Sequence, residues 1–207
     1  MRNNAPIDGI VLAAGRSSRM GRPKALLAAG DETFLARAVR LLADAGCRSV
    51  IVVLAADDAE GADRALVAGA SVARNPDADS EPIDSVRAGL QATADAEAAL
   101  ILPVDLPLIQ PRTVSALVRA WRASGARILL PETAGQTGHP ILLDRSLFAE
   151  VLSRPLAEGL HTLIRDNADT VQRVPVSDPG IHDDVDTPDE YARHFADAVD
   201  PGRGAEP

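Results

Sequence analysis

The sequence predicts an α/β fold with a central, mostly parallel sheet. Apolar runs bounded by turn residues alternate with segments of helical periodicity, the pattern of successive βα units. The best of these runs are nearly continuous in apolar character, which is typical of strands covered by helices on both faces. With 207 residues, 46% of them hydrophobic, the chain can bury a sizeable core. We expect one domain over residues 1–199 and a flexible tail at 200–207, where Gly, Pro and charged residues concentrate.

The elements can be placed in order. Strands are expected at residues 10–14, 50–54, 99–102 and 127–130. Two helices are indicated by apolar stripes, one formed by Leu35, Val39 and Leu42 and the other, with Pro111 in its first turn, by Val114, Leu117, Val118 and Trp121. Thr187 to Glu190 has the pattern of a capping box with proline at the first helical position. A last helix should therefore run from Pro188 to about Ala198.

Composition excludes several classes of function. The net charge is -9 and no basic stripe stands out, which argues against a nucleic-acid partner. Cys47 is the single cysteine, so neither a disulfide framework nor a cysteine metal site is available, and we expect a buried, inert thiol. The first eight residues are polar and no apolar run approaches the ~20 residues of a membrane span. We expect a cytoplasmic protein without a membrane partner.

The strongest functional signal is the loop from Leu12 to Lys24, directly after the first predicted strand. Gly15 and Gly21 permit close backbone approaches, so that consecutive N–H groups can face phosphate oxygens. Arg19 and Lys24 would neutralise a triphosphate, and Lys24 is the only lysine among the 21 Lys and Arg residues. The spacing fits neither a P-loop nor a GxGxxG fingerprint. An ordinary solvated surface loop is the alternative.

The segment LAAGRSSRMGRPK, residues 12–24, resembles the LAAGxSxRMGxxK signature of the MobA/MocA-like molybdenum-cofactor nucleotidyltransferases. The resemblance implies a three-layer, Rossmann-like nucleotidyltransferase fold, an aspartate that holds a metal after a later strand, and Mg²⁺ as the cofactor. Lys24, Arg19 and Asp105 would be the catalytic residues. The nucleotide would be held by Leu12, Ala13, Ala14, Gly15, Arg16, Ser17, Gly21, Asn75 and Ser85.

Two acidic segments are candidates for the metal. Asp105 follows a predicted buried strand, and one carboxylate together with substrate phosphates suffices for Mg²⁺. The segment from Asp184 to Pro188 resembles the DxDTP element of the same family, and an extended chain would point Asp184 and Asp186 to the same face. We favour Asp186 as the second ligand. Helix capping by Asp105 and helix-terminal electrostatics for the other acids are the alternatives.

Other segments are similar to the family in part. Asn75-Pro76-Asp77 with Ser85 resembles a stretch near the nucleoside, but Glu81 and Asp84 add negative charge there, so either their side chains face away or the acceptor differs. Gly138 and His139 belong to a GxxGHP turn that would border the acceptor, and a purely structural turn is the alternative. His161 stands where the family usually has arginine, so the identity of the acceptor is open.

These residues suit the transfer of an NMP group from an NTP to a phosphorylated acceptor, with release of pyrophosphate. The protein positions two anions and neutralises developing charge, so no covalent nucleophile is needed. Ala13-Ala14-Gly15 with Pro23 is closer to the cytidylyl branch, so we favour CTP over GTP. Molybdopterin is the expected acceptor. A sugar- or polyol-phosphate transferase and a non-catalytic NTP sensor or molybdoenzyme chaperone are the alternatives, and contacts with a molybdoenzyme or a second copy are left open.

Overall fold

The computed structural model describes residues 2, 4–15, 17, 19–76, 81–93 and 95–195. Several predictions fall outside these residues: the nucleotide contact of Arg16, the family match at Asp77, the tail at 200–207, and the end of the last helix at 196–198. The described strands are β1 (Ile7–Leu12), β2 (Ala28–Ala29), β3 (Glu32–Thr33), β4 (Ser49–Ala55), β5 (Ser71–Asn75), β6 (Ala98–Pro103), β7 (Ile128–Thr133), β8 (Gln136–Thr137), β9 (Ile141–Asp144) and β10 (Val171–Pro175).

The described α-helices are α1 (Phe34–Asp44), α2 (Ala59–Val67), α3 (Pro82–Ala92), α4 (Pro111–Ala123), α5 (Phe148–Ser153), α6 (Leu160–Asp166) and α7 (Pro188–Phe195). Short 3₁₀ turns lie between them, at η1 (Lys24–Leu26), η2 (Arg145–Leu147), η3 (Ala168–Thr170) and η4 (Pro179–Ile181). Among the described residues no helix is long and apolar enough to cross a membrane.

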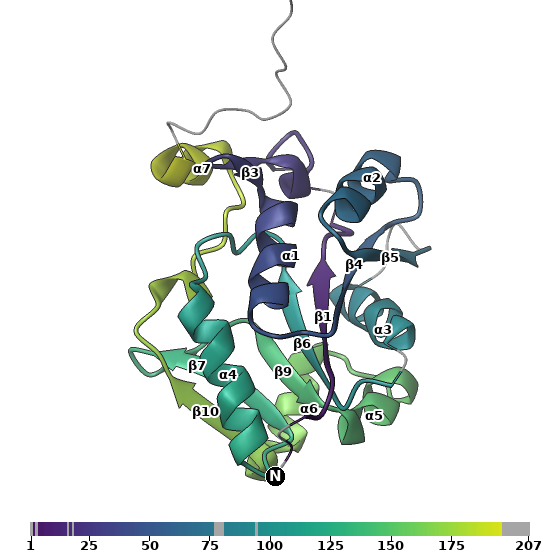
Figure 1. Ribbon diagram of the computed structural model, residues 1–207, viewed down its shortest axis with the longest axis vertical. Helices are drawn as coiled ribbons and strands as arrows, with labels where there is room; N and C mark the ends of the chain where they lie inside the picture. Colours follow the sequence, from purple (N-terminus) through teal and green to yellow (C-terminus); the bar gives the residue numbers. More distant parts are fainter. Residues whose placement is uncertain are drawn as a thin grey trace, which may run out of the picture.

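The main sheet has eight strands in the order β10-β7-β9-β6-β1-β4-β5, with β8 paired to β7 beside this path. Strand β1 lies between β4 and β6 and is parallel to both. Strand β9 runs antiparallel to its neighbours β6 and β7, and β10 is parallel to β7. Because β1, β4 and β6 are parallel, the loops that follow them emerge at one edge of the sheet (Figure 1).

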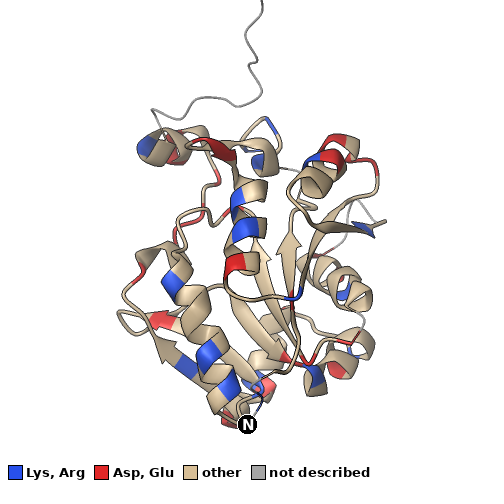
Figure 2. Cartoon of the chain, in the orientation of Figure 1, with Lys and Arg blue, Asp and Glu red and all other residues tan. Residues whose placement is uncertain are grey.

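Helices cover both faces of this sheet (Figure 1). Alternate residues of β1 point to opposite faces of the sheet. Ile7 and Val11 pack in the core under α1 and α4, and Ile10 packs in the core under α3 and α5. Trp121 of α4 is fully buried, and its indole nitrogen donates to the Asp144 carboxylate at 3.1 Å. Figure 2 shows charged residues mainly on helices and loops, while the central strands are mostly uncharged. The predicted fold class is confirmed.

Strand boundaries differ from the prediction. Strand β1 begins at Ile7, three residues before the predicted start at residue 10. The strand can include the acidic Asp8, which is 1% exposed, because the Asp8 carboxylate pairs with the Arg48 guanidinium at 2.8 Å. Its ladder ends at Leu12, so Ala13 and Ala14 lie in the loop. The predicted strand at 127–130 is β7, which begins at residue 128 and extends to residue 133.

Candidate nucleotide and acceptor site

The carboxyl ends of β1, β4 and β6 bring the predicted loops together. The backbone N–H of Ala13 donates to the Val53 carbonyl oxygen at 2.9 Å, which ties the loop after β1 to β4. The N–H of Val104 donates to the Leu12 carbonyl oxygen at 3.0 Å, which ties the segment after β6 to β1. The fold therefore places Asp105 beside the loop that carries Lys24.

Ser17 organises the described part of this loop. Its backbone φ is 49°, in the left-handed region, and its carbonyl oxygen accepts the N–H groups of Met20 at 3.0 Å and Gly21 at 3.2 Å. Its hydroxyl oxygen accepts the N–H of Lys24 at 3.0 Å. Gly21 has a φ of 72°, a conformation that favours glycine. The turn that these contacts close directs the chain into η1, whose first residue is Lys24.

Lys24 joins the two predicted metal segments. Its ammonium Nζ donates to Asp105 Oδ2 at 2.9 Å and also bonds to Asp186 Oδ1. The guanidinium of Arg19 pairs with the other oxygen of Asp186. The side chains of Lys24 and Asp186 are 13% and 14% exposed, whereas that of Arg19 is 70% exposed. The structure thus brings together the predicted Lys24, Arg19, Asp105 and Asp186.

Both Lys24 and Asp186 are charged at neutral pH. Burial alone would lower the pKa of Lys24, but the hydrogen bonds to Asp186 and Asp105 outweigh it and hold that pKa above its ordinary value. The hydrogen bond from Lys24 holds the pKa of Asp186 below its ordinary value, against the opposing effect of burial. The two shifts have the directions expected of an ion pair.

Asp186 is positioned by its neighbours in the chain. Val185 is fully buried, and its N–H donates to the carbonyl oxygen of Asp105 at 2.9 Å, so the backbones of the two acidic segments are joined. Glu190 accepts the N–H groups of Asp186 and Thr187, both at 2.9 Å, and the Thr187 hydroxyl accepts the N–H of Glu190 at 3.3 Å. These reciprocal bonds confirm the predicted capping box.

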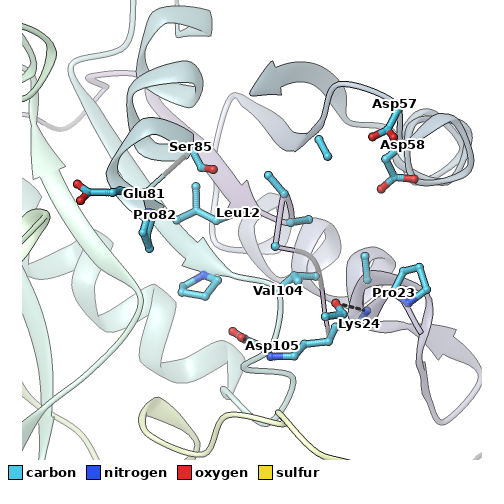
Figure 3. A pocket seen from close by; sticks show the side chains of 17 residues that line it. Leu12, Pro23, Lys24, Asp57, Asp58, Glu81, Pro82, Ser85, Val104 and Asp105 are labelled. Carbon is cyan, nitrogen blue, oxygen red and sulfur yellow. Dashed lines mark hydrogen bonds and ion pairs between the residues drawn. The ribbon is translucent and has the colours of Figure 1, made fainter. Parts of the chain in front are cut away.

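A cavity of about 880 Å³ lies at this edge of the sheet and is here called the larger cavity. Figure 3 shows Lys24 extending towards Asp105 on one side of it, with Asp57 and Asp58 on another. The predicted nucleotide residues that line it are Leu12, Ala13, Ala14, Gly15, Ser17 and Ser85, together with Lys24 and Asp105. Gly21 is not among its lining residues.

The segment expected near the nucleoside reaches the larger cavity through Ser85. Asn75 is 3% exposed, is not among the lining residues, and donates its side-chain amide to the Ser85 hydroxyl at 3.0 Å. Asp84 accepts the N–H of Glu81 at 3.1 Å and pairs with Arg87 at 2.9 Å, so its charge is neutralised locally. Glu81 lines the cavity, but its carboxylate points away from Leu12 in Figure 3.

A second cavity of about 440 Å³, the smaller cavity, adjoins the first. Asp105 and Pro103 line both cavities, so Asp105 lies at their junction. The predicted acceptor residues Gly138 and His139 line the smaller cavity. Its other lining residues are Leu106, Leu130, Thr137, Ile141, His161, Ile164, Ile181, His182 and Asp184.

His139 contributes a neutral imidazole to the smaller cavity. The pKa of His139 is lowered to about 4, chiefly by burial; Asp105 opposes this shift, and the nearby His161 and His182 add to it. The ring therefore acts at neutral pH as a hydrogen-bonding group without charge. This state suits the recognition of a polar acceptor but supplies no fixed positive charge.

Gly138 has a packing role in the same turn. A Cβ atom at this position would lie 2.3 Å from the carbonyl oxygen of Ile181, so the close approach requires glycine. The N–H of His139 donates to that same oxygen at 3.2 Å. The absence of a side chain at Gly138 thus allows η4 and the following residues to close one side of the smaller cavity.

Comparison with known proteins agrees with this geometry. Residues 9–172 match the MobA-like NTP transferase domain. The chain belongs to this family. The matched region includes the glycine-bounded loop, Asp105 and the turn at His139, and it ends before the segment that carries Asp186.

Relatives within and around the family differ in their named activities. The chain is 30% identical to nicotine blue oxidoreductase of Paenarthrobacter nicotinovorans, over 90% of this chain and 95% of that protein. It is 28% identical to the molybdenum cofactor cytidylyltransferase of Escherichia coli K12, over 89% and 93% of the two chains. It is 32% identical to a probable molybdenum cofactor guanylyltransferase of Mycobacterium avium strain 104, over 79% and 81%.

Solved structures show the same fold. The crystal structure of Rv0371c from Mycobacterium tuberculosis H37Rv is similar with a TM-score of 0.78 and 28% identity, covering 93% of this chain and 98% of that one. A manganese complex of the same protein is similar with a TM-score of 0.72, 26% identity and the same coverage. Divalent metal thus occurs in a structural relative of this MobA-like chain.

The residues of the site fit a divalent cation. Asp105 and Asp186 both contact the single Nζ atom of Lys24, so their oxygens converge on a space that one cation can fill. Among the described residues no group of three or more His, Cys, Asp or Glu side chains could hold a metal. A pair of carboxylates whose shell is completed by substrate phosphates and water is a usual arrangement for Mg²⁺.

Sequence reasoning missed three kinds of site residue in this MobA-like chain. His182 lines the smaller cavity from the turn after η4, and only its position four residues before Asp186 could have indicated it. The sequence pattern indicates Glu190 as a helix cap but gives no sign that it also holds Asp186 through the backbone N–H of that residue. Asp57 and Asp58 line the larger cavity after β4, where the end of a parallel strand was the available signal.

Proposed function

We propose that the chain is a Mg²⁺-dependent nucleotidyltransferase that moves CMP from CTP to molybdopterin and releases pyrophosphate. One observation carries this proposal: Asp105, held by Lys24, lies at the junction of the larger and smaller cavities. The larger cavity would hold the nucleotide and the smaller one the acceptor. Both reactants would then meet beside the same carboxylate.

The chemistry needs little beyond positioning and charge. An oxygen of the acceptor phosphate forms a bond to the α-phosphorus of CTP, the bond from that phosphorus to the β-phosphate oxygen breaks, and pyrophosphate leaves. Asp105 and Asp186 would hold Mg²⁺, which neutralises developing charge on the phosphates when bound. Lys24 and Arg19 would add positive charge, and the loop from Leu12 to Ser17 would bind the triphosphate through its backbone.

The preference for CTP rests on the loop. Ala13-Ala14-Gly15 with Pro23 before Lys24 resembles the cytidylyl branch more than the guanylyl branch, whose loop usually carries a pair of glycines. The comparisons do not separate the two donors, because the chain is 28% identical to the E. coli cytidylyltransferase and 32% identical to the M. avium guanylyltransferase. GTP is the alternative donor.

The test is pyrophosphate release from CTP and GTP in parallel, each with Mg²⁺ and molybdopterin. The wild-type protein should release pyrophosphate faster with CTP. Asp105→Ala should abolish release, and Asp189→Ala should retain it, because Asp189 is an exposed acid of the first turn of α7 that lines neither cavity. Thermal unfolding of each variant confirms that it is folded.

Other outcomes separate the alternatives. Faster release with GTP would overturn the preference for CTP and leave the transferase chemistry standing. Release with a sugar or polyol phosphate, but not with molybdopterin, would change the acceptor class. Metal-dependent NTP binding without release with any acceptor would favour the sensor or chaperone alternative.

Redox chemistry is the second candidate, because the similarity to nicotine blue oxidoreductase covers nearly both whole chains. The cluster of Lys24, Asp105 and Asp186 beside the larger cavity favours nucleotidyl transfer over redox chemistry. A lysine beside two carboxylates is suited to binding phosphate and a metal ion. A protein that binds neither NTP nor Mn²⁺ would contradict the transferase proposal and favour the redox candidate.

A further inference from the structure

Lys24 holds the two carboxylates that the proposed function assigns to the metal. Its Nζ atom lies 2.9 Å from Asp105 Oδ2 and contacts Asp186 Oδ1, and the side chains of Lys24 and Asp186 are largely buried. A Mg²⁺ ion bound to both carboxylates would need oxygens at about 2.0–2.1 Å. The ammonium group therefore fills the space in which such an ion would bind.

One space cannot hold both cations. A divalent ion can reach the two carboxylates only when Nζ has moved away, and the displaced ammonium then needs another anion. At the same time the pair of acids cannot lose Lys24 without leaving two negative charges close together and partly buried. Release of Lys24 and entry of the metal are thus expected to occur together.

The larger cavity provides space into which the Lys24 side chain can move. Among the lining residues that the structure describes, Lys24 is the only basic one, and three acids besides Asp105 share the cavity with it: Asp57, Asp58 and Glu81. A bound triphosphate would supply the anion that attracts Nζ away from Asp105. Without nucleotide, Nζ stays on Asp105 and Asp186, while Asp57 and Asp58 lie on another side of the cavity (Figure 3).

We propose that Lys24 is an internal counter-ion that is exchanged for the divalent metal when the nucleotide binds. This inference rests on the proposed function for the identity of the ligands. Its consequence is that NTP and metal bind with positive coupling: each raises the affinity of the protein for the other by the same factor. The free protein should bind the metal weakly, because Lys24 must first leave.

The experiment is titration of the free protein with Mn²⁺ alone, followed by electron paramagnetic resonance, and the same titration with the non-hydrolysable α,β-methylene analogue of CTP. In the wild type the analogue should raise Mn²⁺ affinity by at least about fivefold, the lower range of typical coupling. Lys24→Met should raise the Mn²⁺ affinity of the free protein by a similar factor. The analogue should then raise it by a smaller factor than in the wild type, because its phosphates still supply metal ligands but no longer release Lys24.

Two control variants make the result specific. Among the described residues Arg19 pairs with Asp186 and not with Asp105, and its side chain is 70% exposed, so Arg19→Met should raise Mn²⁺ affinity less than Lys24→Met does. Asp105→Asn in the Lys24→Met background should remove the gain. Lys24→Gln, which keeps a neutral donor, provides a second variant if Lys24→Met does not fold.

An unchanged or weaker Mn²⁺ affinity in folded Lys24→Met and Lys24→Gln would overturn the exchange. Equal gains in Arg19→Met and Lys24→Met would also overturn it, because they would indicate a general effect of charge. These titrations involve no turnover. They therefore distinguish failure of the exchange from failure of the proposed transferase activity, which would appear as absence of pyrophosphate release.

Discussion

Replacing His139 with glutamine should make the protein less sensitive to mild acid. Burial lowers the pKa of this histidine to about 4, compared with an ordinary value of 6.5. Between these two pH values the unfolded chain binds a proton that the native state does not. Stability therefore rises with pH across this window, and the native protein loses stability as the pH falls from 6.5 towards 4.

The size of the effect follows from the two pKa values. At pH 7 His139 lowers the free energy of unfolding by close to zero, since its ring is largely neutral in both the native and the unfolded state. At pH 5 the unfolded histidine is almost fully protonated while the native one is mostly neutral, and linkage gives a cost of about 2 kcal/mol. Glutamine does not titrate, so His139→Gln should be free of this cost.

The assay is urea unfolding of both proteins at pH 7 and pH 5. The free energy of unfolding of the wild type should fall by about 2 kcal/mol more than that of His139→Gln between these pH values. Other groups titrate in both proteins and largely cancel in the comparison. An equal fall in the two proteins would refute the assignment of a neutral, half-buried His139.

Three further predictions concern separate parts of the molecule. Glu190→Ala should weaken Mn²⁺ binding in the presence of the CTP analogue by about tenfold, because Glu190 accepts the N–H of Asp186 at 2.9 Å. Glu190→Gln keeps a hydrogen-bond acceptor and should bind Mn²⁺ nearly as the wild type does. Equal losses of Mn²⁺ affinity in the two variants would refute the positioning role. Gly138→Ala should lower the free energy of unfolding by about 1–3 kcal/mol, since the new Cβ would lie 2.3 Å from the Ile181 oxygen, and an unchanged urea midpoint would contradict this. Burial raises the pKa of Cys47 to about 12, so a thiol reagent at pH 8 should react slowly with the native protein and rapidly after unfolding; rapid labelling of the native protein would count against an inert thiol.

Much of the fold could be predicted because its central elements have strong, local signals. The stripe that ends at Trp121 lies on α4 and is buried, and the capping box at Thr187 begins α7 as expected. The edge strands β5 and β10 carry few buried residues, so their segments lack an apolar run. Strand β9 is fully buried but only four residues long, and its antiparallel direction depends on neighbours distant in sequence.

The candidate site shows a similar division. The loop up to Lys24 and the carboxylate of Asp105 could be recognised from residues that are close together in sequence. The choice between Asp184 and Asp186 could not, because it depends on which distant residues each side chain meets once Val185 between them is buried. Asp184 lines the smaller cavity, while Asp186 contacts Lys24.

The central claim is that an NMP group passes between two reactants that meet at Asp105, and label transfer tests it most directly. The protein would be incubated with Mg²⁺, molybdopterin and CTP labelled with ³²P at the α-phosphate, and the products separated by anion exchange. The account predicts that the label appears in the acceptor together with unlabelled pyrophosphate, and that Asp105→Ala produces neither. Label that remains in CTP, or that appears only in free CMP, would contradict it.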